Sequence, residues 1–216
     1  MKKNILPLLL FLNTLFLIPT KGYSQKKLSF GFRISTSLGF HTTQSMLSSS
    51  SFTPKSGYSF GALAEYKIIG PLSVRAEILY SNRGFKDKVN FTDASGNAYY
   101  EGYIKTNMNY IDLPIMAKIS FGNTVKPYFL IGGFGSIFLN GKQKNNFTIP
   151  GSTADISSSP YKAPSYDFGA LGGFGLDFKI SSLILFTELR YNHGLVNLDL
   201  YNTKIRSLDI AAGLRF

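Results

Sequence analysis

Histidine is the residue type best suited to acid–base catalysis near neutral pH, and this chain has two histidines. His41 stands close to the hydroxyl groups of Thr42 and Ser45, and His193 is followed directly by a glycine. A hydrolase would need one of these histidines beside a serine nucleophile, with an acid to orient the imidazole. The plainer interpretation makes both histidines rim residues of the folded domain, so we predict no catalytic residue.

Metal and cofactor chemistry has few residues to draw on. The sequence contains no cysteine, which excludes thiolate sites, disulfides and a lipid-bearing cysteine. Asp87, Asp93 and Glu101 lie in one polar stretch, but they lack the regular spacing of a calcium-binding loop. The Gly-Gly-Phe-Gly runs fall inside apolar segments, where glycine permits bends and close packing. We therefore predict neither a metal site nor a cofactor.

Charged residues recur at alternate positions in many segments and suit a structural role. Glu188 and Arg190 are two residues apart, so they share one face of an extended strand, where pairing is favoured over acid–base work. Such cations and carboxylates nearly balance in number, and buried charges are tolerated when they are paired and hydrogen-bonded. We predict an internal charge network formed by Arg33, Glu65, Lys67, Arg75, Glu77, Arg83, Asp112, Lys118, Asp167, Asp177, Glu188, Arg190, Asp209 and Arg215.

The elements that must position these charges are strands, because apolar and polar residues alternate with a period of two. In the first segment, Phe30 and Phe32 fall on one face and Arg33 on the other. Pro114 lies inside the fourth segment, where it demands a bulge or an unpaired donor. The fifth segment is apolar on both faces, so its facing stays open. The eight segments are residues 28–40, 58–68, 72–85, 105–121, 125–139, 165–178, 183–195 and 206–216.

The connections between these segments alternate between long and short. Residues 41–57, 86–102, 141–164 and 196–203 are long and polar, whereas 69–71, 122–124 and 179–182 are short. This alternation, an even strand count and strands long enough to cross a bilayer are typical of outer-membrane barrels. We predict an all-β fold, an eight-stranded antiparallel up-and-down transmembrane β-barrel with short periplasmic turns and long extracellular loops.

Alternation by itself also fits a soluble lipocalin-like barrel, which has its apolar face inside. Balanced charges and many small residues on the polar face favour the membrane version, since the narrow lumen of eight strands is filled by side chains. A soluble periplasmic carrier of apolar ligands remains the alternative. The aromatic residues expected to form girdles at the two membrane interfaces are Phe40, Tyr58, Tyr80, Phe85, Tyr103, Phe121, Tyr128, Phe178, Tyr191 and Phe216.

The N-terminus predicts export. Lys2 and Lys3 precede a mostly apolar stretch at residues 5–18, which is shorter than the roughly 20 residues of a spanning helix. We predict a signal peptide at residues 1–24 and a barrel domain at residues 25–216. The formal net charge of +11 is scattered along the chain, which argues against nucleic acid and favours anionic lipid head groups. Phe216 ends the last strand, as expected of a C-terminal signal read by the barrel assembly machinery.

Several motifs, taken in order, resemble the PorT-like outer-membrane β-barrel family of the Bacteroidetes lineage. They are Gly61-Ala-Leu-Ala-Glu-Tyr66, Val74-Arg-Ala-Glu-Ile-Leu-Tyr-Ser81, Tyr110-Ile-Asp-Leu-Pro-Ile-Met-Ala-Lys118, Lys126-Pro-Tyr-Phe-Leu-Ile-Gly-Gly133, Gly169-Ala-Leu-Gly-Gly-Phe-Gly175 and Glu188-Leu-Arg-Tyr-Asn-His-Gly194. The resemblance implies an integral outer-membrane barrel in a family named for a member associated with protein secretion. It brings no catalytic or ligand residue.

These observations together predict a non-enzymatic outer-membrane barrel with a plugged polar lumen. We expect it to act as a structural, assembly or secretion-associated, or adhesion component through its long loops, of which 141–164 is the longest. Its expected partners are outer-membrane lipid, the barrel assembly machinery and other envelope or secretion proteins. The enzymatic alternative is a barrel that hydrolyses acyl chains of lipid A or phospholipid through His41 or His193.

Overall fold

The computed structural model describes residues 27–42, 52–92, 98–148, 155–197 and 204–216. The signal peptide expected at residues 1–24 lies outside these segments. Within the described segments, no helix is long and apolar enough to cross a membrane. The fold consists of strands: β1 (Leu28–Thr42), β2 (Phe52–Thr53), β3 (Lys55–Ile69), β4 (Leu72–Thr92), β5 (Ala98–Ser120), β6 (Val125–Thr148), β7 (Asp155–Pro160), β8 (Tyr166–Ile180), β9 (Leu183–Gly194) and β10 (Lys204–Arg215).

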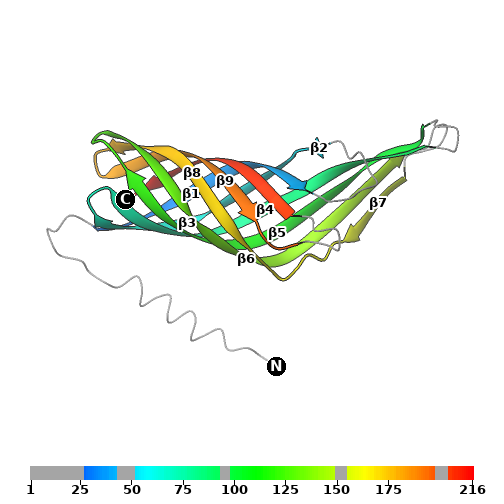
Figure 1. The fold of residues 1–216 in the computed structure, drawn as a ribbon, viewed down its shortest axis with the longest axis horizontal. Coiled ribbons are helices and arrows are strands. Elements are labelled where there is room, and N and C mark those ends of the chain that lie inside the picture. The colour runs from blue at the N-terminus through cyan, green and yellow to red at the C-terminus, as the bar shows by residue number, and fades with distance from the viewer. Residues whose placement is uncertain (1–26, 43–51, 93–97, 149–154, 198–203) are drawn as a thin grey trace, which may run out of the picture.

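Eight long strands close into one antiparallel barrel, which confirms the predicted fold class (Figure 1). Each strand pairs with its neighbours along the chain, and β1 pairs with β10 from Gly31 opposite Arg215 to Thr42 opposite Lys204. The backbone of Phe216 exchanges two hydrogen bonds with Phe30, so the last residue completes this seam. The two remaining strands are short additions, β2 on β4 and β7 on β6.

The three short connections are tight turns at one end of the barrel. Gly70 and Gly122 adopt positive φ angles of 51° and 89°, a backbone conformation that glycine adopts without steric cost. Ser181 adopts a φ of 55° in the third turn. In outer-membrane barrels, short turns face the periplasm, and we call this the periplasmic end.

The predicted long loops at 86–102 and 141–164 were largely wrong. The β4–β5 hairpin stays paired out to Thr92 opposite Ala98, and β6 continues to Thr148 with β7 along its side. The error has a physical cause: beyond the bilayer both faces of a strand meet water, so the apolar alternation disappears while the strand continues. These strands therefore project well past the rest of the barrel (Figure 1). Most of the other two predicted loops lies outside the described residues.

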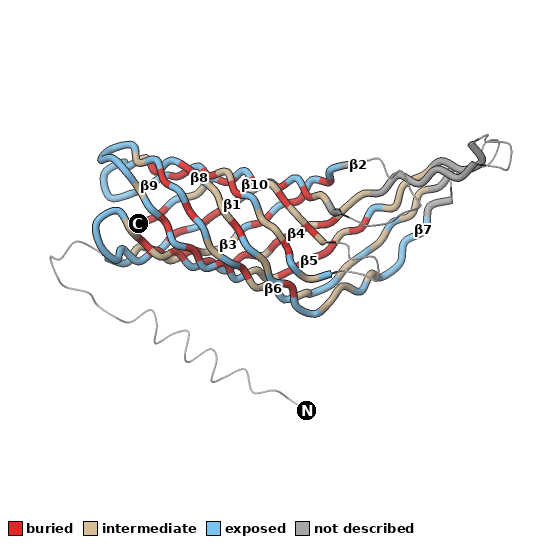
Figure 2. Tube along the Cα trace, viewed as in Figure 1, coloured by how far each residue is buried: buried red, intermediate tan, exposed pale blue. Residues whose placement is uncertain are grey.

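Burial alternates along the strands (Figure 2). This is the pattern expected when every second side chain turns into the lumen. The outward side chains form an apolar belt in which Ile131 is 72% exposed and Ile34 is 64% exposed. The facing of the fifth segment is now decided, because Phe129 and Ile131 point outward while Tyr128 is buried. Tyr128 and Phe85 consequently do not join the aromatic girdles, as the alternation of their strands turns both toward the lumen.

Pro114 is accommodated without a bulge at its own position. It pairs with Phe134 of β6 in regular register, while the ladder between β4 and β5 skips Glu77 and Ile78 opposite Leu113 and Pro114. Proline lacks an N–H, and it therefore lies where β4 and β5 are locally unpaired. Of the two outcomes that the sequence predicted, a bulge or a local loss of pairing, the structure shows the second.

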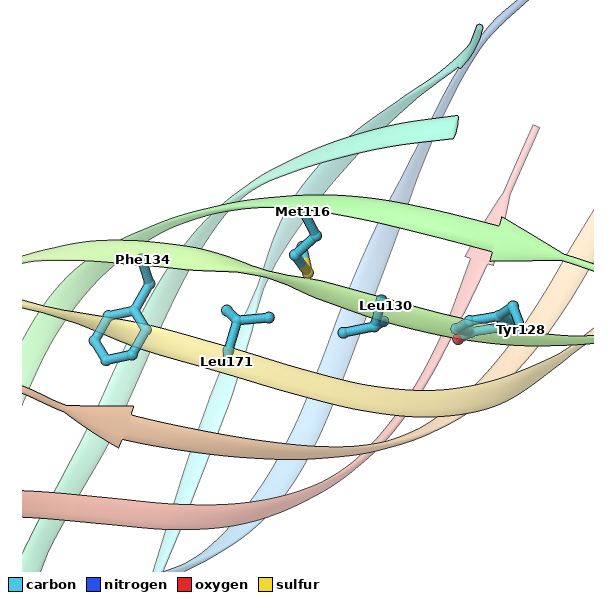
Figure 3. Close-up of a cluster of buried hydrophobic side chains, with 5 residues drawn as sticks. All are labelled: Met116, Tyr128, Leu130, Phe134 and Leu171. Carbon is cyan, nitrogen blue, oxygen red and sulfur yellow. The ribbon is translucent and has the colours of Figure 1, made fainter. Parts of the chain in front are cut away.

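Apolar side chains fill two parts of the lumen beside the charges. One cluster consists of Met116, Tyr128, Leu130, Phe134 and Leu171, projecting inward from β5, β6 and β8 (Figure 3). A second cluster, nearer the extracellular end, is built on Met108, Tyr110 and Ile205, with Phe85, Phe138, Tyr161 and Ala163 packed against it. The first cluster therefore packs beside the charged side chains, and the second packs beyond them toward the extracellular end.

Candidate functional site

The lumen holds a network of charged side chains, and its centre is formed by three arginines that are almost completely buried. Arg33 comes from β1, Arg75 from β4 and Arg190 from β9, and all three are at most 2% exposed. Their positions follow from strand alternation, because each lies on the inward phase of its strand. Buried guanidinium groups require partners, and carboxylates from other strands supply them.

Glu65 and Asp177 anchor the periplasmic part of the network. Glu65 Oε2 accepts hydrogen bonds from Arg75 Nε at 3.0 Å and Nη2 at 2.8 Å, and from Lys118 Nζ at 3.3 Å. Lys118 Nζ also donates to Asp177 Oδ2 at 2.6 Å. Arg215 pairs with both carboxylates, which ties the closing strand to β3 and β8.

Glu77 and Glu188 form the middle of the network. Arg190 donates to both Glu77 oxygens at 2.9 and 3.0 Å and to Glu188 Oε1 at 2.9 Å. Arg75 Nη1 donates to Glu188 Oε2 at 2.9 Å, so Arg75 joins the middle group to Glu65. Arg33 lies 3.8 Å from Glu188. Charge-assisted bonds of this geometry are strong and fix the side chains relative to one another.

The extracellular part of the network is centred on Arg83. Its guanidinium group donates to Asp112 Oδ1 at 2.8 Å and to Ser136 Oγ at 2.6 Å, and it lies 3.8 Å from Asp167. The same group stacks 4.2 Å from the ring centre of Tyr110. Asp209 accepts hydrogen bonds nearby from Asn192 and Ser207.

Lys67 differs from the other residues assigned to the network. It is exposed near the end of β3, where it lines a periplasmic cavity of about 410 Å³ with Lys27 and Lys126. Lys67 is on the inward-facing phase of its strand, but a side chain is enclosed by the lumen only where neighbouring strands surround it. Lys67 lies at the rim of the barrel, so its side chain stays exposed. A much smaller cavity of about 40 Å³ lies deeper, beside Arg83 and Arg190.

Tyr128 is a network residue that the sequence did not identify. Its hydroxyl donates to Glu188 Oε2 at 3.0 Å, and Lys118 Nζ lies 3.9 Å from its ring centre. The two-sided apolar pattern of its strand hid its facing. Ser136 could have indicated the facing of this strand. It is the small polar residue within 128–139, and it lies on the same strand face as Tyr128.

The two histidines are not brought together with any catalytic set that the structure describes. His193 is half-buried on the outer side of β9, with its ring centre 6.3 Å from that of Tyr191 and its backbone opposite Arg206. His41 belongs to β1, and its side chain lies outside the described residues. Among the described side chains, no group of three or more potential metal ligands is found.

Solved structures of outer-membrane proteins are similar to this chain over most of its length. Ail of Yersinia pestis, solved in complex with the heparin analogue sucrose octasulfate, is 16% identical over 88% of this chain and 99% of its own, with a TM-score of 0.43. Neisserial surface protein A is 18% identical over 86% and 95%, with a TM-score of 0.44. OprG from Pseudomonas aeruginosa is 13% identical over 87% and 95%, with a TM-score of 0.47. No curated protein sequence matches the chain.

A family model gives the assignment. Residues 23–200 match the model described as "Outer membrane protein beta-barrel domain". This range contains every strand from β1 to β9. The outward apolar belt and the closed strand order agree with a barrel that sits in lipid. The chain therefore belongs to the family of outer membrane protein β-barrel domains, and it is located in the cell outer membrane.

Proposed function

We propose that this protein is a non-enzymatic envelope component with a plugged lumen, and that it works through the strands projecting from its extracellular end. The observation that carries the proposal is the continuation of β4, β5 and β6 beyond the apolar belt, with β7 added along β6. A paired wall of this kind presents a defined surface to other molecules, unlike a solvated loop. Structural, assembly or secretion-associated, and adhesion roles all use such a surface.

The packing of the lumen supports a role other than transport. Arg75 and Arg190 each contact two glutamates, and both side chains are almost fully buried. A solute crossing the barrel would have to separate these pairs, and leaving a buried charge unpaired costs about 3 to 5 kcal/mol. In this proposal the charges stabilise the barrel wall, and the parts of the chain outside the membrane carry the function.

The enzymatic alternative has one described candidate residue. His193 faces outward beside Tyr191 and is not joined by a described hydrogen bond to a serine or carboxylate. The soluble carrier is excluded by the outer-membrane family and by the outward apolar belt. A lipid-modifying role predicts that a deletion strain loses a lipid modification, and that wild type restores it while His193→Ala does not.

Two measurements test the proposal. Planar bilayers containing the purified barrel should show no steady conductance, and a stable open channel would contradict the plugged lumen. The second measurement compares proteins that co-purify from the outer membrane with wild type and with a variant lacking residues 88–101. The shortened barrel should keep its heat-modifiable gel mobility but lose specific partners.

The nature of the lost partners separates the roles that the proposal contains. Secretion proteins among the lost partners would support membership of the PorT-like family. An unchanged partner set would refute the role of the projecting strands.

A further inference from the structure

Three lysines stand in one row across the projecting strands. Lys86 of β4 lies directly opposite Lys105 of β5, which lies directly opposite Lys144 of β6. Lys105 and Lys144 are exposed, and Lys86 is half-buried. Strand alternation places all three on the outer face of the wall, away from the lumen, and we call them the lysine row. Lys142 is exposed on the same face, next to the row.

The lysine row stands above the lipid-facing surface of the same strands. A ladder of asparagines marks where the apolar belt ends: Asn82 donates to Asn109 at 2.6 Å, and Asn109 donates to Asn140 at 2.7 Å. One step toward the membrane, Tyr80 and its neighbours on β5 and β6 are aromatic or aliphatic. The lysines lie four residues beyond the ladder on β4 and β5, about 13 Å along a strand.

Placing like charges directly opposite one another is unfavourable in a sheet, so the row requires a negative partner. None of the described side chains on this outer face, from β4 to β6, is a carboxylate. Lys86 is held in position because its Nζ lies 4.2 Å from the ring centre of Tyr103, whose hydroxyl accepts a hydrogen bond from Asn146. The register therefore aligns three cations, and an aromatic ring holds the one at the β4 end of the row.

One lysine of the row also acts on the inner side of the wall. Lys55 faces the lumen beyond the apolar belt, and its pKa is lowered to about 8, first by burial and then by the charge of Lys105. Its ammonium group has no hydrogen-bond partner among the described residues. Lys55 and the lysine row together concentrate positive charge just beyond the apolar belt. Such a region is electrostatically complementary to an anionic surface.

We propose that the lysine row binds the phosphate groups of the glycolipid in the outer leaflet of the same membrane. The row faces sideways, on the same outer face as the apolar belt, so it meets molecules that stand beside the barrel. A lysine stem is long and flexible, so its ammonium group can reach back toward the head-group layer. This inference deepens the proposed function, since it names a lipid contact for the projecting strands.

The test uses purified full-length barrel in phosphatidylcholine nanodiscs with increasing amounts of diphosphorylated lipid A. The variant carries Lys86→Gln, Lys105→Gln and Lys144→Gln, and the control carries Lys67→Gln, Lys126→Gln and Lys179→Gln at the periplasmic end, with the same change in net charge. The readout is the rise in unfolding temperature with lipid A content. We expect an apparent affinity roughly fivefold weaker for each lysine removed, on the order of a hundredfold in total. The control should match wild type.

Further arms identify the source of the phosphate. Dephosphorylated lipid A should give no rise for any protein, and high salt should reduce the wild-type rise, because exposed charges are screened. The proposal is overturned if the variant responds like wild type, if the control loses the same affinity, or if inorganic phosphate reproduces the rise. Tighter binding of a soluble sulfated polysaccharide would equally overturn it, in favour of a partner outside the membrane.

A second variant keeps the test decisive, and the two experiments can fail independently. If the triple variant does not fold, the double variant of the exposed Lys105 and Lys144 replaces it, with Lys67 and Lys179 as its control. Because the assay contains purified protein and defined lipid, its failure leaves the protein-partner experiment above unaffected.

Discussion

Replacing Arg75 with alanine tests whether the charge network stabilises the barrel. Arg75 is 0% exposed and donates three hydrogen bonds, two to Glu65 and one to Glu188. It also stacks 5.0 Å from the ring centre of Phe186. Removing one partner of a buried ion pair costs about 3 to 5 kcal/mol, because the other charge is left uncompensated.

The surviving contacts place the expected loss near the lower end of that range. Glu65 keeps Lys118 and Arg215, and Glu188 keeps Arg190. We therefore expect Arg75→Ala to lower the free energy of unfolding by about 3 kcal/mol. This free energy is measured by urea unfolding in detergent micelles. Far-UV circular dichroism follows the unfolding, because the chain contains no tryptophan whose fluorescence could report it.

A double-variant cycle separates the ion pair from the loss of packing. Arg75→Met keeps most of the side-chain volume, and combining it with Glu188→Gln removes both charges of one pair. We expect the combined loss to be smaller than the sum of the two single losses by about 1 kcal/mol or more. Additive losses, or a change below about 1 kcal/mol for Arg75→Ala, would show that water reaches these charges and would refute the buried network.

Three other perturbations follow from the structure. The pKa of Lys55 is lowered from 10.5 to about 8 in the folded protein, so the unfolded chain holds more protons between these values and the free energy of unfolding rises with pH there. Lys55→Met should show a smaller rise in urea titrations from pH 7.5 to 10, and an identical rise in the variant would contradict it. Tyr128→Phe should destabilise the barrel by about 1 to 2 kcal/mol, since Glu188 loses a buried donor; an unchanged urea midpoint would argue against that bond. If Phe216 is read as an assembly signal, as the sequence predicts, deleting it should slow assembly in cells, measured as the fraction of heat-modifiable protein; normal assembly would refute that prediction.

The sequence by itself determined the barrel, its strand order and the direction of most side chains. Period-two alternation is a local property, and it places Arg33 inside and Phe32 outside without knowledge of any partner. The three short connections likewise lie where the sequence placed them, between β3 and β4, β5 and β6, and β8 and β9. The pairing of the last strand with the first, with Gly31 opposite Arg215, follows from closing strands of this order into a barrel.

Only the tertiary structure decided which charges meet. Arg75 bonds Glu188, and Arg190 bonds Glu77, across 113 residues of chain in each case, because side chains from separate strands interleave across the lumen. The facing of Tyr128 also needed the closed barrel, since an apolar residue can face lipid or pack in the lumen. The projecting strands escaped prediction for the opposite reason: outside the membrane neither face is apolar, and the hairpin partner holds the strand in place.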